Sequence, residues 1–136
     1  MAVATDTDTT GPIATYPGTT YTIFIHLRTT RDWLELSRGR RAAVIAEHVA
    51  PLLGRYASTT SLRWFDAEAF SADPTDIAVV TTTALQDWYD LYEELRDSPL
   101  WTVPYFTTER IVLALEQGFE GFEQRRGKGD VAAPST

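Results

Sequence analysis

Three basic side chains in two alternating segments are the first candidates for chemistry. His26 and Arg28 lie in residues 21–28, and Arg63 lies in a second alternating segment, residues 60–68. An imidazole, with an ordinary pKa near ~6.5, exchanges protons at neutral pH. Guanidinium groups hold carboxylates and enolates through paired hydrogen bonds. We therefore predict His26 as a catalytic proton carrier, with Arg28 and Arg63 holding an anionic group of a substrate.

Each of these residues also has a structural interpretation. His26 could hydrogen-bond across a sheet or subunit interface, and the two arginines could pair with acidic groups of a partner subunit. His48 lies beside Glu47 and is best explained by a hydrogen bond to a nearby carbonyl or carboxylate. Since one histidine can serve as an axial ligand, haem stays open as an alternative, but the two histidines lack the HxxxH or HExxH spacing of metal sites.

Two carboxylates form a second candidate group. Asp66 and Glu68 in the sequence FDAEAF are two residues apart, so they share a face if the strand continues through them. Paired carboxylates perform acid–base chemistry or bind a metal. Asp73 and Asp76 lie close by in sequence, and a turn-capping or edge-solvating role explains all four equally well. We predict no metal site.

The segment 21–28 is the element that must position His26. Its alternation predicts a strand with two different faces. One face is apolar and suits packing against helices: Tyr21, Ile23, Ile25 and Leu27. The other combines Thr22, Phe24, His26 and Arg28. A water-facing surface seldom needs Phe24 and a dry core does not favour Arg28, so we expect a partly buried face that meets a ligand or a second subunit.

The remaining pattern predicts alternating helices and strands. A short helix over 31–36 is followed by a longer one that Ser37 caps and Pro51 kinks. Strands follow at 60–68 and 77–82. Thr83 and Gln86 have capping-box spacing and open a further helix. We expect a last strand at 101–106, with Pro104 at an edge or a bulge, and a final helix at 109–124. Its expected apolar stripe is Ile111, Leu115, Phe119 and Phe122.

This order is β-α-β-β-α-β plus a terminal helix, so the predicted fold class is α+β, ferredoxin-like, with sheet order 4-1-3-2. Helices cover one face of such a sheet, and two sheets closed on each other form a dimeric α+β barrel. We therefore predict a homodimer joined through the uncovered face. The folded unit is expected at 20–124, between disordered tails at 1–19 and 125–136.

Composition excludes several functional classes. The 136 residues contain no cysteine, which excludes disulfides, cysteine-bound zinc and thiol catalysis. The net charge of -7 and the pI near 4.7 argue against nucleic acid and anionic membranes as partners. No apolar run approaches the ~18 residues needed to span a bilayer, and no secretory signal is recognisable. The expected location is the cytoplasm.

Several stretches resemble one family: YTIFIHLRTTRDWLELSRGRR, AEHVAPLLGRY, LRWFDAEAFSADPTDIAV and LRDSPLWTVPYF. They are similar to the darcynin family, and the resemblance covers about residues 21–122. It implies a small dimeric α+β barrel protein and carries no established activity. Gly39 and Arg40 depart from the family pattern, in which acidic residues are commoner there, and this affects only how the second helix begins.

The predicted function is a cofactor-independent proton-transfer reaction, of the isomerase, cyclase or lyase type, on a small carbonyl-bearing, natural-product-like substrate. Phe24, Phe65 and Tyr105 are expected to contact this substrate together with the arginines. This prediction follows by analogy with dimeric α+β barrels, which often hold a small organic substrate between sheet and helices. The alternative is a non-catalytic protein that binds a small ligand or only dimerises. No glycine-rich nucleotide loop or GxSxG motif is present, and no cofactor is predicted.

Overall fold

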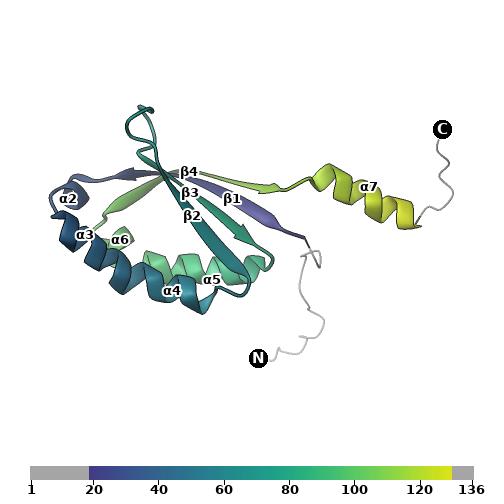
Figure 1. The fold of residues 1–136 in the computed structure, drawn as a ribbon, viewed down its shortest axis with the longest axis horizontal. Coiled ribbons are helices and arrows are strands. Elements are labelled where there is room, and N and C mark those ends of the chain that lie inside the picture. Colours follow the sequence, from purple (N-terminus) through teal and green to yellow (C-terminus); the bar gives the residue numbers. More distant parts are fainter. Residues whose placement is uncertain (1–18, 130–136) are drawn as a thin grey trace, which may run out of the picture.

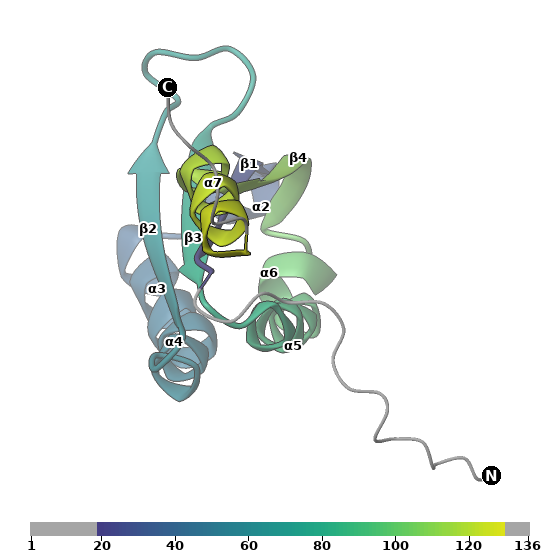
Figure 2. The same cartoon turned by 90° about the vertical axis from the view of Figure 1, so that its right-hand side faces the viewer.

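An antiparallel sheet with helices on one face forms the body of the protein (Figures 1 and 2). The computed structural model describes residues 19–129. The sheet order is β2-β3-β1-β4, which confirms the predicted ferredoxin-like arrangement with the first strand inside the sheet. The elements are β1 (Tyr21–Thr29), α2 (Arg31–Leu34), α3 (Arg38–Val44), the π-helical turn η2 (Ile45–Val49), α4 (Ala50–Arg55), β2 (Thr60–Asp66), β3 (Asp76–Thr82), α5 (Leu85–Arg96), α6 (Pro99–Thr102), β4 (Phe106–Leu115) and α7 (Gly118–Gly129).

Strand β1 has the two faces that its alternation predicts. Its apolar residues Ile23, Ile25 and Leu27 are buried under the helices, where they pack with Val44 and Phe106. The alternate residues point to the uncovered face of the sheet, called the open face below, and are half-buried or exposed. The period of two thus separates a dry core from the face that carries His26.

The long second helix is interrupted by a π-helical turn before Pro51. Ser37 caps its start by accepting the N–H of Arg40, as predicted. At η2 the N–H of Ala50 bonds to the carbonyl of Ile45, five residues back. Pro51 then lies in the first turn of α4, where no backbone donor is needed. The predicted kink is therefore a wide turn just upstream of the proline.

The predicted capping box at the start of α5 is wrong. The helix begins after Ala84, and the Oγ1 of Thr82 accepts the N–H of that residue. Gln86 points along the helix instead and donates to Asp90. The hydroxyl that orders this turn thus comes from the end of β3, one residue before the predicted cap.

The prediction for the last strand and helix is also wrong. Trp101 lies in α6, and Pro104 follows a cis peptide bond in the turn before β4. Residues 106–115 form β4, which pairs with β1 along nearly its whole length. Helix α7 begins at Gly118, after Gln117 in the left-handed region at φ 53°. Pairing with β1 selects the strand, because the run IVLAL suits a strand as well as a helix.

The folded part of the chain extends beyond the predicted C-terminal boundary at residue 124. Helix α7 runs to Gly129 and so enters the stretch predicted to be a C-terminal tail. Residues 1–18 and 130–136 lie outside the described residues, and the predicted tails there stay predictions. Within residues 19–129, no helix is both long and apolar enough to cross a membrane.

The buried face of β1 should dominate stability. Leu27 is 2% exposed, whereas Leu34 in α2 is 59% exposed. Leu27→Ala should lower the free energy of unfolding by about 2–5 kcal/mol, because it removes buried methyl groups and leaves a cavity. Leu34→Ala, the matched control, should stay within about 0.5 kcal/mol. Urea unfolding of both variants measures this, and equal losses would show that the assigned core face is incorrect.

Candidate functional site

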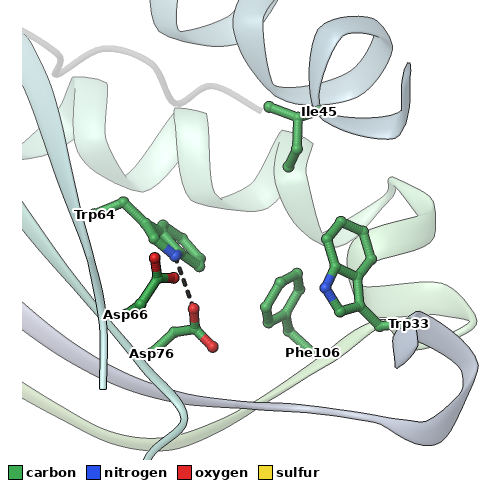
Figure 3. A pocket seen from close by; sticks show the side chains of 6 residues that line it. All are labelled: Trp33, Ile45, Trp64, Asp66, Asp76 and Phe106. Atoms are coloured by element: carbon green, nitrogen blue, oxygen red, sulfur yellow. Dashed lines mark hydrogen bonds between the residues drawn. The ribbon is translucent and has the colours of Figure 1, made fainter. Parts of the chain in front are cut away.

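Two carboxylates lie directly opposite each other at the end of the β2–β3 ladder. The register pairs Asp66 with Asp76, on the face of the sheet that the helices cover. Asp76 is only 6% exposed. Its two oxygens accept hydrogen bonds from Trp64 Nε1 at 2.8 Å and from Thr75 Oγ1 at 2.7 Å. The Trp64 hydrogen bond is drawn in Figure 3.

The environment raises the pKa of Asp76 above its ordinary value. Burial is the main cause, because it disfavours the charged form. The hydrogen bonds from Thr75 and Trp64 oppose this effect, and the neighbouring Asp66 adds to it. Asp66 itself is exposed, so water surrounds its charge. Adjacent carboxyl groups in unlike environments are the arrangement in which one donates and the other accepts a proton.

Aromatic rings enclose this pair in a cleft between the sheet, helix α2 and the π-helical turn η2. The cleft holds about 240 Å³, and Figure 3 shows its lining residues Trp33, Ile45, Trp64, Asp66, Asp76 and Phe106. A neighbouring hollow of about 310 Å³ shares Trp33, Asp66 and Asp76 and adds Arg41 and Glu68. Together they form one aromatic cleft with its polar groups gathered at one end. Such a cleft suits a small organic molecule.

Hydrogen bonds and ring contacts hold the side chains of the cleft wall in place. Thr30 Oγ1 accepts the N–H of Trp33, and Arg41 Nε donates to the carbonyl of Trp33 at 3.1 Å. The Phe106 ring centroid is 5.0 Å from that of Trp33 and 5.6 Å from that of Trp64. Because Phe106 is buried in the core, it ties both tryptophans to the sheet. A ligand would therefore meet preformed aromatic walls.

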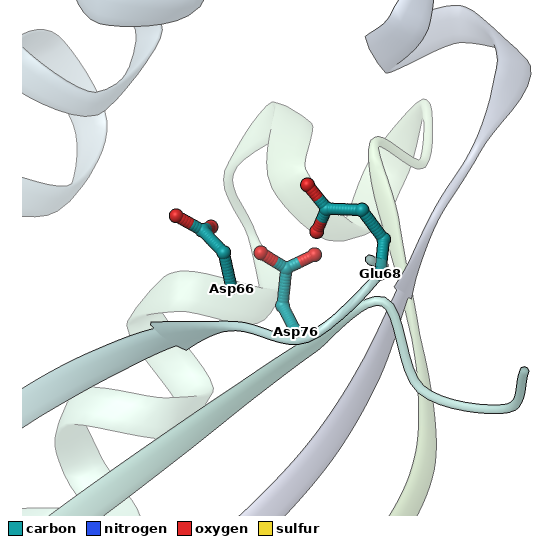
Figure 4. Close-up of side chains that lie close together, drawn as sticks. All are labelled: Asp66, Glu68 and Asp76. Atoms are coloured by element: carbon teal, nitrogen blue, oxygen red, sulfur yellow. The ribbon is translucent and has the colours of Figure 1, made fainter. Parts of the chain in front are cut away.

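Glu68 brings a third carboxylate close to Asp66 and Asp76 (Figure 4). One oxygen each of Asp66, Glu68 and Asp76 lies within 4.8 Å of the others. Asp66 and Glu68 thus lie close together, but not on one face of a continuing strand as predicted, because β2 ends at Asp66. Oxygen ligands of this kind suit hard cations, and carboxyl groups this close together also favour the binding of a proton. We interpret the cluster as a site that handles protons, because burial raises the pKa of Asp76.

The histidine, the arginines and the two phenylalanines predicted as site residues all lie on the open face. Cross-strand pairing places His26 and Phe65 on either side of Ile77, and Phe24 and Arg63 on either side of Val79. A shallow groove of about 330 Å³ on this face includes Phe24 and Arg63 in its lining. His26 lies outside that lining, opposite Arg110 of β4.

The predicted set is only partly brought together. Arg28 forms ion pairs within its own chain, to Asp73 at 3.3 Å and Glu109 at 3.7 Å. The Arg63 guanidinium lies 5.1 Å from the centroid of the Phe65 ring. Tyr105 is on the other side of the sheet, with its ring 5.4 Å from that of Trp33. Tyr105 therefore does not join the other predicted residues.

The sequence interpretation missed Trp33 and left Asp76 as one of several turn carboxylates. Asp76 is ten positions from its partner Asp66, and only the hairpin register brings them together. A signal was available, because Asp76 directly precedes the β-branched run of β3, at the point where a strand returning from the turn at 71–75 would meet the end of β2.

Comparison with known proteins places this geometry in context. A family model described as "Darcynin, domain of unknown function" matches residues 5–133. The protein named Darcynin 1 from Acinetobacter baumannii is 42% identical over 90 residues, which cover 66% of this chain and 99% of that protein. Darcynin from Chromobacterium violaceum is 45% identical over 73 residues, covering 54% of this chain and 91% of that one.

Solved structures share the fold at low identity. A chlorite dismutase mutant from Candidatus Nitrospira defluvii superposes with a TM-score of 0.62 at 17% identity, covering 76% of this chain and 42% of that one. A protein from Thermus thermophilus, described as a novel heme-binding protein, has a TM-score of 0.67 at 15% identity and corresponding coverages of 82% and 46%. The chain thus spans about half the length or less of these two proteins.

The residues of the cleft do not fit haem. Haem iron needs an axial side chain, most often histidine. His26 lies on the open face, and His48 lies in η2 with its Nε2 3.8 Å from Glu47. Neither imidazole lines the aromatic cleft, whose ionisable groups near Asp76 are mainly carboxylates.

The raised pKa of Asp76 predicts a specific dependence of stability on pH. The folded protein binds this proton more tightly than the unfolded chain does. Its free energy of unfolding should therefore fall as pH rises from about 4, the ordinary aspartate value, through the folded pKa. Asp76→Asn keeps an oxygen that accepts from Trp64 but removes the ionisation. Its stability relative to the unchanged protein should increase as pH rises from about 4 through the folded pKa of Asp76.

Urea unfolding at several pH values measures this difference. Asp97→Asn, at an exposed carboxylate after α5, serves as the control for the loss of a surface carboxylate. A flat or falling difference for Asp76→Asn would contradict the assigned environment of Asp76.

Proposed function

The chain belongs to the darcynin family, and we propose that it binds a small carbonyl-bearing organic molecule in the aromatic cleft and transfers protons through Asp66 and Asp76. The observation that carries the proposal is the pairing of a buried and an exposed carboxylate, directly opposite each other, against aromatic walls. The reaction class follows from these two groups and requires no cofactor.

The cleft favours a flat and mostly apolar ligand. Trp33, Trp64 and Phe106 offer ring faces and edges, and Ile45 adds an aliphatic wall. Rings of this kind gain free energy from stacking and from the apolar area they cover. Polar groups lie at the end formed by Asp66 and Asp76, so a ligand would place its carbonyl there and its hydrocarbon part among the rings.

Asp76 and Asp66 would divide the acid and base roles. The protonated Asp76 donates a hydrogen bond, and then its proton, to the carbonyl oxygen of the ligand. The Asp66 carboxylate removes a proton from the adjacent carbon, which turns the carbonyl compound into its enol. Return of a proton to a different carbon completes an isomerisation, and attack by the enol carbon on a second carbonyl of the ligand completes a cyclisation.

The open face supports a second candidate site. Phe24 and Arg63 line its groove, and within residues 19–129 Arg63 has no ion-pair partner. A planar carboxylate could lie against this guanidinium, with His26 as the nearby proton carrier and Phe65 as apolar contact. Arg28 is less available, because Asp73 and Glu109 already neutralise it. This site depends on residues that the aromatic cleft does not use.

A homodimer is the third part of the proposal. Apolar side chains on the sheet remain about two-fifths exposed or more, including Phe24, Phe65 and Val112. Adjacent exposed residues of this size are typical of surfaces that meet another chain. A binding protein that dimerises without turnover is the alternative, and it predicts ligand binding without proton exchange.

Solvent exchange of ligand protons tests the catalytic part directly. Small aromatic ketones would be screened by quenching of tryptophan fluorescence, because Trp33 and Trp64 line the cleft. Ligands that bind would then be followed by NMR in D2O. The unchanged protein should accelerate deuterium incorporation beside the carbonyl. Asp76→Asn and Asp66→Asn should each slow it by about 10²–10⁴-fold while fluorescence quenching persists.

Two controls separate the candidate sites. Asp97→Asn should keep full exchange, and Arg63→Met with His26→Gln should keep it if the aromatic cleft is the site. Exchange lost only in the Arg63 and His26 variants would move the activity to the open face. Binding without any exchange by the unchanged protein would leave a ligand-binding protein with no proton transfer.

A further inference from the structure

The C-terminal half of β4 is an unprotected strand edge. β4 is an outer strand of the sheet, and its outer side has no strand partner in the described part of this chain. Four residues in its last half are exposed by between 41% and 53%: Ile111, Val112, Leu113 and Leu115. Exposed edges are ordinarily blunted by charges, prolines or bulges, and residues 111–115 carry none of the first two. The irregularity of the β1–β4 pairing lies earlier, near Leu27.

Both faces of this half-strand are apolar. Ile111, Leu113 and Leu115 point to the helix side, where no helix within residues 19–129 covers them, and Val112 and Ala114 point to the open face. Helix α7 does not fold back over this strip but extends away from the body (Figure 1). A strand with two apolar faces and a free edge has the pattern of an interior strand of a larger sheet.

We propose that β4 pairs antiparallel with β4 of a second copy of this chain, about a twofold axis at Leu113, so that the two sheets become one. This inference rests on the homodimer proposed above and identifies its contact surface. Antiparallel pairing of a strand with its own copy is isologous, so this contact closes at two chains and leaves no free β4 edge for a third. The outward-facing backbone groups of residues 111–115 would gain the partners that they lack in one chain.

The register of the β4–β4 pair follows from the side chains that would lie opposite each other. Opposed residues of antiparallel strands share a face, so the two numbers of each pair must sum to an even value. Centring on Leu113 places Ile111 opposite Leu115 and Val112 opposite Ala114. Centring one residue earlier places Leu115 opposite the charged Glu109. Only the Leu113 register matches apolar with apolar over the whole of 111–115.

Charge supports the same register independently. With Leu113 at the axis, Arg110 of each copy lies opposite Glu116 of the other. The two residues share a side of the strand, since Arg110 is opposite His26 and Glu116 lines the open-face groove. Neither residue forms an ion pair within the described part of the chain. The pairing would thus give each of these charges an opposite partner, twice per dimer.

Helix α7 would add to this contact. It follows Glu116 and Gln117 directly, and its Phe119 and Phe122 are 70% and 48% exposed, with ring centroids 6.5 Å apart. In an antiparallel pair, residues beyond 115 of one copy run alongside the earlier half of β4 in the other. The two phenylalanines would then meet the second copy, because they stay largely exposed within the described residues 19–129.

A single introduced cysteine tests the axis, since the chain has none of its own. Leu113→Cys should form a disulfide with its counterpart under mild oxidation, because opposed antiparallel residues have Cα atoms about 4.5–5.5 Å apart, within disulfide range. The band near twice 15.2 kDa should appear on a non-reducing gel. Phe70→Cys, at a side chain that is 95% exposed in the turn after β2, should cross-link at least about tenfold more slowly.

Charge reversal tests the register in the intact chain. Arg110→Glu and Glu116→Arg should each weaken dimerisation at least tenfold by sedimentation, and the double variant should restore it. If the single variants dimerised weakly because they were misfolded, the double variant would not restore the dimer. Circular dichroism of each single variant checks its fold directly. Equal cross-linking of Leu113→Cys and Phe70→Cys, or no rescue by the double variant, would overturn the β4 pairing.

The mass of the unchanged protein separates this inference from the homodimer itself. A molecular mass of 15.2 kDa at tens of micromolar protein would reject both. A dimer that neither cross-links at position 113 nor responds to charge reversal would retain the homodimer and reject only the β4 contact. Dissociation of that dimer by Phe24→Asp would then place the contact on the open face.

Discussion

Asp66 and Asp76 face each other because the same backbone ladder that builds the core also holds them. Asp76, Ala78, Val80 and Thr82 alternate along β3 and are all buried. A slip of one residue between β2 and β3 would turn this set toward the open face. A change of register therefore cannot separate the two carboxylates without exposing the buried residues of β3. Burial and the neighbouring Asp66 instead raise the pKa of Asp76.

The one-sided cover of the sheet explains where the other surfaces lie. Helix α2 and the π-helical turn η2 close the aromatic cleft on one side, with Trp33 and Phe106 as the joint between helix and sheet. On the opposite side no helix of the described chain is present, so the alternate residues of the strands carry arginines and half-exposed aromatics. The helices that cover one face of the sheet also leave the last half of β4 uncovered. The chain thus presents one enclosed site and two surfaces suited to contact with other molecules.

The sequence predicted correctly those elements whose hydrophobic pattern is compatible with only one type of secondary structure. The alternation of 21–28 predicted β1 and its two faces, and the order of elements predicted the sheet. It failed where a pattern suits two structures: the run IVLAL with Phe119 and Phe122 beyond it fits a helical stripe, and only pairing with β1 makes it a strand. The same limit applies to the site. The contribution of Asp76 depends on the β2–β3 register, and that of Trp33 depends on how α2 packs.

The protonation of Asp76 is the central claim, and the carboxyl chemical shift of this residue tests it most directly. Aspartate would be labelled with 13C, and the Asp76 signal would be assigned by its loss in the Asn variant and followed from about pH 2 to pH 8. The account predicts that this signal titrates above the ordinary aspartate value of about 3.9. A midpoint at or below that value would show that Asp76 is already ionised in the folded protein, and the proton-transfer proposal for the aromatic cleft would be contradicted.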